Sequence, residues 1–400
     1  MRKKTYHQSR CTTVAGKLLA LLIAALPVAA LAADDVAPGF VWSVEGQARY
    51  DDNVYRTNNR TESDGSFVLR PELAWIFLRG QHQFDLDYKG DYVVYLNESQ
   101  LDYTGHQFGA HALLDHSARF KTDYTLGFEK TVDQPGANSS VNLPGETPDK
   151  WENSSFAAQA NYGNPDSRGQ LVGRLNYNQK RYTNNNQEFR DYDGNGGTGT
   201  FYYQIAPRTR LLFELDYIDY DYQNQDRFGF DQSSKQTRYL SGVTWEASGK
   251  TTGVFKIGYR DRQYENDRFD DLTGLYLSLD GIWEPTEYTS VTLTASQDNQ
   301  DSAQQASGGF VQTEIKTNVV YGISPRTRLI GALGFRNEDF KGQFDREDER
   351  WNLSLGVQYS LLYWLDIGAE YQYGDRDSTI DVFDFTANMF MINVVINFDD

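Results

Sequence analysis

The sequence predicts an all-β chain that forms one transmembrane antiparallel β-barrel of about 18 strands, of the outer-membrane kind. Two hairpin-like stretches, residues 203–222 and 321–335, each hold an apolar run, a Pro-Arg-Thr turn and a strictly alternating run. No long stretch of the chain shows the apolar periodicity of amphipathic helices. Short turns and long polar loops then alternate to the C-terminus. A single closed sheet explains all three observations.

The first of these hairpins illustrates the alternation. After its turn, Leu211, Phe213 and Leu215 fall on one side of the strand, while Glu214 and Asp216 fall on the other. Neighbouring side chains in a strand point to opposite faces, so this run has one apolar and one polar face. Lipid outside and water inside are the solvents that suit such a strand.

The composition agrees with a strand-rich membrane protein. The 400 residues include 27 Tyr and 23 Phe but only 3 Met. Aromatic residues favour strands and collect at membrane interfaces. The mean hydropathy of −0.64 is compatible with a membrane, because one polar face in every strand dilutes the apolar signal.

The N-terminus has the pattern of a cleaved secretory signal peptide covering residues 1–32. A basic segment precedes an apolar run from Leu18 to Ala30, and Ala30-Leu31-Ala32 suits the cleavage site. We expect residues 33–39 to form a short periplasmic segment and residues 40–400 to form the barrel. The predicted location is therefore the outer membrane of a Gram-negative bacterium.

Charge and cysteine content exclude several functions. The formal net charge is −18, and removal of the leader makes the chain more acidic, since residues 1–32 hold only basic charges. A polyanion needs a basic surface, so nucleic acid is excluded as a partner. The only cysteine, Cys11, lies in the leader, which excludes disulfides, cysteine nucleophiles and thiolate metal sites from the mature chain.

The first strands alternate clearly. In residues 41–50, Trp42, Val44 and Tyr50 share one face, opposite Glu45 and Arg49. The second run, from Phe67 to Phe77, contains Pro71. Proline lacks the N–H that a ladder needs, so we expect a bulge or local break there.

The remaining strands are separated by connections of two kinds. The short ones are Arg79-Gly80, Asp115-His116, Asn164-Pro165-Asp166, Ala206-Pro207-Arg208, Ala247-Ser248-Gly249, Glu284-Pro285-Thr286, Ser324-Pro325-Arg326 and Leu361-Leu362-Tyr363. The long ones are centred near residues 58, 100, 141, 188, 229, 267, 304, 346 and 379. Their number implies about 18 strands, with 16 as the alternative, short turns on the periplasmic side and long loops outside.

Parity along each run assigns the faces. Leu86, Leu126, Leu175, Ile257 and Leu355 represent the lipid-facing set. The intervening charged residues are predicted to line the pore: Asp85, Asp87, Lys89, Lys121, Asp123, Arg174, Glu214, Asp216, Lys256, Arg260, Asp366 and Glu370. Charge pairing across the wall is the simplest role for these residues.

The longest loop, residues 131–151, is the candidate constriction, because no separate plug domain precedes the barrel. Its marked residues are Pro135, Asn138, Pro144 and Pro148. A barrel of this size encloses a water-filled channel unless something narrows it. We therefore expect this loop to fold inward, with an exposed surface loop as the alternative.

No metal, cofactor or catalytic residue is predicted. Asp191 to Gly196 begins like a calcium loop, but Tyr202 occupies the twelfth position, where a bidentate Glu is required. We interpret that segment as a glycine-rich extracellular loop. An outer-membrane hydrolase would need a base beside its nucleophile, and His106 near Asp102, like His82, His111 and His116, lacks a diagnostic spacing.

The chain closes on an alternating strand. Phe390, Ile392, Val394, Ile396 and Phe398 share one face. Outer-membrane barrels commonly end this way, as a signal to the barrel-insertion machinery. Two aspartates follow Phe398, which is a small departure from that pattern.

The segment Tyr50-Asp51-Asp52-Asn53-Val54-Tyr55-Arg56-Thr57, together with the leader and the hairpins, resembles the putative beta-barrel porin 2 family over about residues 40–400. The resemblance implies a wide outer-membrane conduit for a secreted exopolysaccharide. In such a conduit the inward charges could form a ladder that guides the sugar chain by hydrogen bonds, with lumen aromatics as gliding surfaces. Its expected partners are outer-membrane lipids, the polysaccharide cargo, and periplasmic polysaccharide export and chain-length proteins. A general or sugar-selective diffusion porin and an outer-membrane hydrolase are the alternatives.

Overall fold

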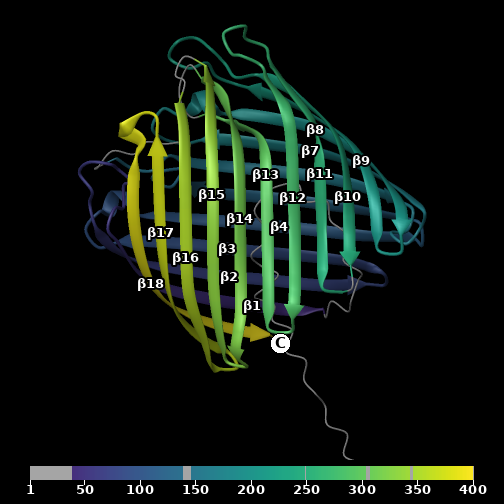
Figure 1. Cartoon of the computed structure of the whole chain (residues 1–400), viewed down its shortest axis with the longest axis horizontal. Coiled ribbons are helices and arrows are strands. Elements are labelled where there is room, and N and C mark those ends of the chain that lie inside the picture. The colour runs from purple at the N-terminus through teal and green to yellow at the C-terminus, as the bar shows by residue number, and fades with distance from the viewer. Residues whose placement is uncertain (1–37, 138–145, 248, 303–306, 343–345, 400) are drawn as a thin grey trace, which may run out of the picture. The chain divides into compact units, whose positions relative to one another are not determined.

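The computed structural model describes residues 38–137, 146–247, 249–302, 307–342 and 346–399. These residues form one antiparallel sheet that closes on itself, because β1 pairs with both β2 and β18 (Figure 1). The predicted leader, residues 1–32, and most of segment 33–39 lie outside the described residues. Within the described part, no helix is long and apolar enough to cross a membrane.

Eighteen strands make up the sheet, as the sequence predicts. They are β1 (Gly39–Asp51), β2 (Asp64–Arg79), β3 (His82–Tyr95), β4 (Tyr103–Ser117), β5 (Phe120–Val132), β6 (Lys150–Tyr162), β7 (Gly169–Tyr182), β8 (Tyr192–Ala206), β9 (Thr209–Tyr222), β10 (Ser234–Ala247), β11 (Thr251–Tyr264), β12 (Leu272–Thr286), β13 (Thr289–Asp301), β14 (Ser307–Ser324), β15 (Thr327–Gly342), β16 (Arg346–Leu362), β17 (Leu365–Ser378) and β18 (Phe385–Asp399). Among the described residues, three single 3-10 turns lie in long loops: η3 (Ser99–Leu101), η4 (Glu188–Arg190) and η5 (Asp381–Phe383).

Two short turns lie a few residues later than predicted. Strand β4 continues through Asp115 to Ser117, and β12 continues through Pro285 to Thr286. In both hairpins the register shifts just before the turn, between Asp115 and Ser117 and between Trp283 and Thr286. Turn-forming residues therefore occupy irregular strand ends at these two places, which the sequence pattern does not distinguish from turns.

Pro71 breaks one ladder locally. The pairing of β2 with β3 stops after Leu69 and resumes at Glu72 in the same register. On its other side, Pro71 stays paired with Val44 of β1. The predicted break is thus present without a register shift, and Gly90 leaves room for the proline ring, which would lie 3.0 Å from an added Cβ.

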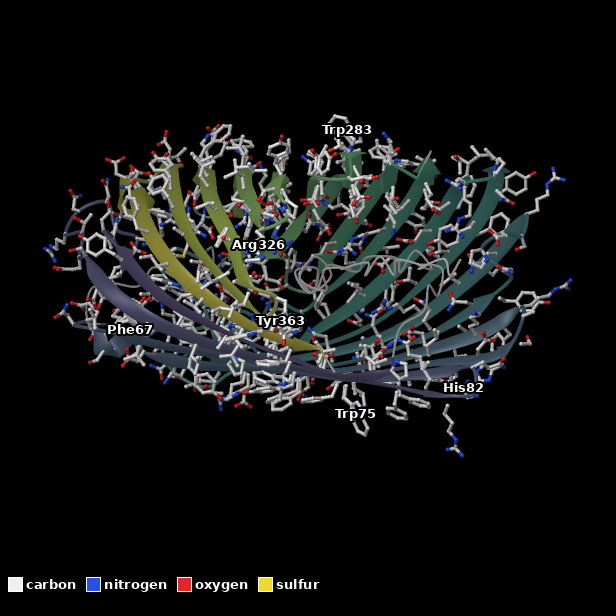
Figure 2. The ribbon with its side chains drawn as sticks, turned by 90° about the horizontal axis from the view of Figure 1, so that it is seen from below. Phe67, Trp75, His82, Trp283, Arg326 and Tyr363 are labelled. Carbon is white, nitrogen blue, oxygen red and sulfur yellow. The ribbon has the colours of Figure 1, made fainter. Side chains whose placement is uncertain are left out.

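The two faces of the wall differ as parity predicts. Leu126, Leu175, Phe213, Ile257 and Leu355 are exposed on the outer face. Trp75 and Trp283 both project outward, from opposite sides of the barrel (Figure 2). Polar and charged side chains fill the alternate positions, so they face the lumen. An apolar outside and a polar inside are what a barrel needs in a bilayer.

The apolar outer belt ends at a row of tyrosines. Tyr217, Tyr239 and Tyr259 are exposed on β9, β10 and β11, and the next outward positions on β9 and β11 are Asp219 and Asp261. Strands of 13 to 18 residues exceed the 9–11 residues needed to cross a bilayer. The strands therefore continue beyond the belt at the long-loop end.

The motif after β1 fastens the seam of the barrel. The Asp52 carboxylate accepts hydrogen bonds of 2.7 Å from both the backbone N–H and the side-chain amide of Asn388 in β18. The buried Asn53 donates to the carbonyl oxygens of Thr57 and Thr386, and Arg56 forms a 2.6 Å ion pair with Asp51. The Asp-Asp-Asn segment thus connects the loop after β1 to the last strand, β18.

Candidate functional site

The lumen is the candidate site, because all twelve predicted pore-lining residues occupy inward positions by parity. Asp216, Lys256, Arg260 and Asp366 are also almost fully buried. Several form ion pairs within the wall: Lys256 with Glu214 at 2.8 Å, Lys121 with Asp115 at 2.8 Å and Lys89 with Glu72 at 3.6 Å. Charge pairing therefore occupies part of the predicted set.

His106 and His111 lie on opposite faces of β4. His111 faces the lumen between two carboxylates, with Nδ1 2.8 Å from Asp85 and Nε2 2.7 Å from Asp123. His106 lies on the opposite face of β4, with Nδ1 3.0 Å from the Tyr88 hydroxyl. Asp102 accepts a hydrogen bond from the Tyr95 backbone. These side chains satisfy one another across strands.

The root of the longest loop, residues 133–149, is tied to the wall beside it. Asp133 accepts hydrogen bonds from the Trp151 indole N–H at 3.0 Å and the Tyr182 hydroxyl at 3.2 Å. Arg190 contacts both Asp133, at 3.2 Å, and Asp149, at 3.8 Å. Burial raises the pKa of the Asp149 carboxyl, while Asn185 and Arg190 act in the opposite direction.

The same loop contacts the far wall close to its start. The Gly136 carbonyl accepts a 2.6 Å hydrogen bond from Arg350 of β16, and Arg376 of β17 lies 3.5 Å from the same oxygen. Strands β17, β18, β1, β2, β3 and β4 separate β16 from β5, where the loop begins. Residues 133–137 therefore lie inside the barrel. We call Arg350 and Arg376 the latch.

Gly136 is required where the loop meets the latch. Its φ of +74° is one that residues with side chains rarely adopt, and an added Cβ would lie 2.7 Å from Cβ of Arg56. Pro135 is part of this contact segment, and Pro148 is buried at the other end of the loop. The predicted Asn138 and Pro144 lie outside the described residues.

The latch belongs to a charged wall on β14–β17 that the sequence reasoning missed. Arg350 lies 3.2 Å from Glu338, Arg346 lies 2.6 Å from Asp348 and Arg336 lies 2.6 Å from Glu314. Glu338 and Asp348 are fully buried. Inward parity was the available signal, because these arginines alternate with outward residues such as Trp351.

The wall of β6–β8 is different, since neutral amides and rings dominate it. The inward amides are Asn153, Gln159, Asn161, Asn176 and Asn178. Above them, Lys180 Nζ lies 4.3 Å from the centre of the Trp151 ring and 5.0 Å from that of Tyr182. Amides, hydroxyls and ring faces can bind sugar hydroxyls and the apolar faces of sugar rings.

The glycine-rich segment 191–196 is not a loop, so that prediction is wrong. It belongs to β8 from Tyr192 onward, paired with β7 through Asn178 to Gly194 and Asn176 to Gly196. An added Cβ on Gly196 would lie 2.6 Å from the Asn176 amide, so the glycine admits its neighbour's side chain. Within the described ranges, no group of three or more His, Asp or Glu could hold a metal ion.

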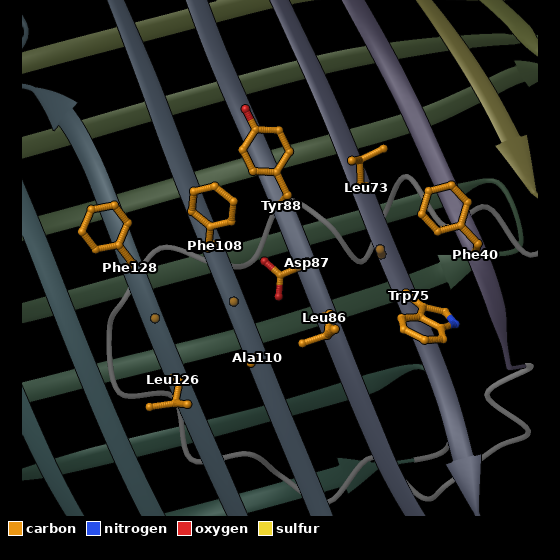
Figure 3. Close-up of a pocket in the computed structure, with 13 residues that line it drawn as sticks. Phe40, Leu73, Trp75, Leu86, Asp87, Tyr88, Phe108, Ala110, Leu126 and Phe128 are labelled. Atoms are coloured by element: carbon orange, nitrogen blue, oxygen red, sulfur yellow. The ribbon is translucent and has the colours of Figure 1, made fainter.

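An apolar depression lies on the outside of the wall formed by β1–β5. Leu73, Trp75, Leu86, Phe108 and Leu126 line it (Figure 3). All five are exposed outward residues of the apolar belt. In a bilayer this surface faces acyl chains, so it is not part of the route through the barrel.

Known proteins resemble this barrel. The family model described as "Putative beta-barrel porin 2" matches residues 40–398. Pseudomonas aeruginosa OpdO has a TM-score of 0.50 at 11% identity, over 90% of this chain and 98% of that one. Acinetobacter baumannii OccAB3 gives 0.47 at 12% identity, over 90% and 99%. The OpdO likeness shows the fold alone. No curated protein matches the chain.

Proposed function

The chain belongs to the family described as "Putative beta-barrel porin 2", and from that premise we propose that it is an outer-membrane conduit for a secreted polysaccharide. The family and the closed barrel make it a porin-like channel of the outer membrane. Export of a sugar polymer is the finer proposal, and it is based on the side chains that line the lumen.

The observation that carries a channel function is the contact between Gly136 and Arg350. A loop held inside a polar lumen narrows a water-filled route at one level without filling the barrel. We propose that residues 133–149 form this constriction. The root contacts to Asp133 and the latch at Gly136 would hold the loop at a fixed height.

The amide-rich wall supports a sugar polymer as cargo. Amide groups both donate and accept hydrogen bonds, so they can bind sugar hydroxyls without forming ion pairs. The nearby Trp151 and Tyr182 rings offer apolar surface. Such a wall can make many weak contacts with a sugar polymer. Weak contacts allow the polymer to move along the wall more easily than one strong binding site would.

Deletion of the gene in its native host tests the export proposal. We expect extracellular polymer to fall and polymer to collect in the periplasm, while polymer synthesis continues. Re-expression of the full chain should restore export. Unchanged extracellular polymer would reject the proposal, and reduced uptake of a small sugar in the same strain would favour a diffusion porin. Periplasmic export and chain-length proteins are the partners that this function requires.

A diffusion porin is the alternative that the structure favours second. The constriction proposed for residues 133–149 would equally sort small solutes by size. Liposome swelling with mono- and disaccharides distinguishes the two functions, because a dedicated export route should pass these sugars slowly. The hydrolase alternative has no support, since His106 and His111 lie on opposite faces of the wall and each is engaged.

A further inference from the structure

Three cations follow one line down the lumen wall of β7–β9. Lys180 and Arg174 are inward residues of β7. Arg210 of β9 reaches the same line, because its Nη1 donates a 2.9 Å hydrogen bond to the Gln170 side chain of β7. We call Lys180, Arg174 and Arg210 the cation track.

None of the three forms an ion pair within the described part of the chain. Lys180 lies over the Trp151 and Tyr182 rings, and Arg210 lies 4.6 Å from the centre of the Tyr202 ring. Arg210 otherwise binds neutral groups, Gln170 and Thr244. The ion pairs of this part of the wall use other cations, Lys256 with Glu214 and Arg238 with Asp216.

A fourth cation, which is buried, also has no ion pair among the described residues. Arg260 of β11 is 2% exposed, and its guanidinium donates to the backbone carbonyls of Leu275 and Gln297. Its Nε is buried with no hydrogen-bond partner. The wall of β7–β11 therefore holds four cations that form no ion pair with the other residues that the structure describes.

The track is long enough to span the membrane. Lys180, Arg174 and Gln170 are separated by six and four residues along β7. At about 3.3 Å per residue, the gaps are roughly 20 and 13 Å, and the whole line is about 33 Å. Barrel strands tilt by about 35–45°, so this line rises roughly 23–27 Å along the barrel axis, from Arg210 at the short-turn end to Lys180 at the long-loop end, beyond the outward Tyr177.

The wall of β1–β5 has the opposite polarity. Its inward carboxylates include Glu45, Glu72, Asp85, Asp87, Asp91, Asp115, Asp123 and Glu129, and they outnumber its inward cations, Arg49, Arg70, Lys89 and Lys121. Asp87 and Glu129 have no ion pair among the described residues, and Asp85 and Asp123 share His111. An anion inside the barrel is therefore drawn to the track and repelled from the wall of β1–β5.

We propose that the cation track binds anionic groups of the cargo in succession, so that the exported glycan is acidic and carries carboxylate or sulfate groups. This inference rests on the proposed export of a polysaccharide. The amide wall beside the track would bind the neutral part of each sugar. Three separated cations permit stepwise movement, because one contact can form before another breaks.

Block of the ion current in planar bilayers by sugar oligomers tests the track. The full-length mature protein is compared in the presence of hexagalacturonate, sulfated maltohexaose and neutral maltohexaose. We expect both acidic probes to block at far lower concentration than the neutral one. Equal block by neutral and acidic probes would overturn the proposal, and a preference between the acidic probes would identify the anionic group.

Neutral variants locate the binding. The double variant Arg174→Gln with Lys180→Gln should weaken block by the acidic probes roughly ten-fold, since two charge contacts are lost. Lys316→Gln is the matched control: this half-exposed lumen cation of β14 is paired with Glu314, and its loss should leave block unchanged. Heat-modified mobility on gels verifies folding of each variant.

Two outcomes separate this inference from the export proposal. If the acidic probes block the double variant as well as they block the wild type, the track is not the binding surface. This conclusion does not depend on what deletion of the gene does to polymer in cells. If acidic probes block through the track but extracellular polymer is unchanged on deletion, export fails and the track serves small anionic solutes. Equal loss of block in Lys316→Gln would also reject the track.

Discussion

Arginine is used in opposite ways on two walls of one lumen. On β14–β17, Arg336, Arg346 and Arg350 each bind a carboxylate, and the carboxylates of Glu338 and Asp348 are fully buried. On β7–β9, Arg174 and Arg210 have no carboxylate partner within the described ranges. The first wall pairs most of its arginines with its own carboxylates, and only Arg376 of the latch has no ion pair among the described residues. On the second wall, neither arginine is paired with a carboxylate that the structure describes.

The difference separates structure from function. Burial of an ion pair is costly, so we interpret the buried pairs of the first wall as contacts that hold elements in place. Here it holds the Gly136 carbonyl through Arg350. A cation with no partner gains little for the fold, and its charge remains available to a ligand. Inward arginines alone would not reveal which use applies.

The largest effect is expected from breaking the paired wall. Arg350→Met removes a cation from the buried Glu338 and the donor from the Gly136 carbonyl. We expect the free energy of unfolding to fall by roughly 3–5 kcal/mol, as for one partner of a buried pair. Urea titration in lipid vesicles, followed by tryptophan fluorescence, measures it. Lys316→Met, at a half-exposed pair on the same wall, should cost less than about 1 kcal/mol. Equal losses would contradict the contrast.

Removal of the loop that the paired wall holds should open the channel. A chain lacking Gly136 to Glu146 loses the segment that contacts Arg350, and we expect its single-channel conductance to rise. Planar-bilayer recordings measure this directly. Gly136→Ala is a milder version, because its positive φ and the nearby Arg56 oppose a side chain. Unchanged conductance in the deletion variant would show that residues 136–146 do not constrict the lumen.

A carboxylate introduced on the wall of β7–β9 should pair with one of its arginines, as carboxylates do on the wall of β14–β17. Gln170→Glu keeps the shape of the side chain and turns the 2.9 Å hydrogen bond from Arg210 into an ion pair. We expect stability to change by no more than about 1 kcal/mol, but anion selectivity to fall. The reversal potential across a KCl gradient reports this shift. No shift would mean that Arg210 does not act on permeating ions.

The smallest effect on stability is expected at Arg174. Because it has no ion pair among the described residues, Arg174→Gln should change the free energy of unfolding by less than about 0.5 kcal/mol. Urea titration under the conditions used for Arg350→Met gives the comparison. A loss comparable with that of Arg350→Met would show that Arg174 is part of the wall's own structure.

Most of the fold could be predicted from the sequence, because each strand meets lipid on one side and water on the other. Alternation at Leu211 to Asp216 and similar runs identified the strands, and the eight short and nine long connections implied that there are eighteen of them. The ends of the strands could be predicted less well. Pro285 lies in the irregular end of β12, and the glycines of β8 resemble a loop, since local composition does not report which backbone groups are paired.

The candidate site could be predicted only as a set of inward positions. Parity placed Arg174, Asp216 and Lys256 on the lumen side, but their partners lie on other strands. The length of the segment around Pro135 suggested an inward loop. Nothing in it pointed to Arg350, which is more than 200 residues away in the chain.

The sequence by itself determined which side of every strand meets hydrocarbon, because period-two alternation is a local property of neighbouring residues. Only the tertiary structure decided which charges neutralise one another. Pairing depends on closure of the sheet, on the register of its strands and on the contact of Gly136 with Arg350. It therefore distinguishes the latched wall at Arg350 from the wall at Arg174, although both arginines obey the same local pattern.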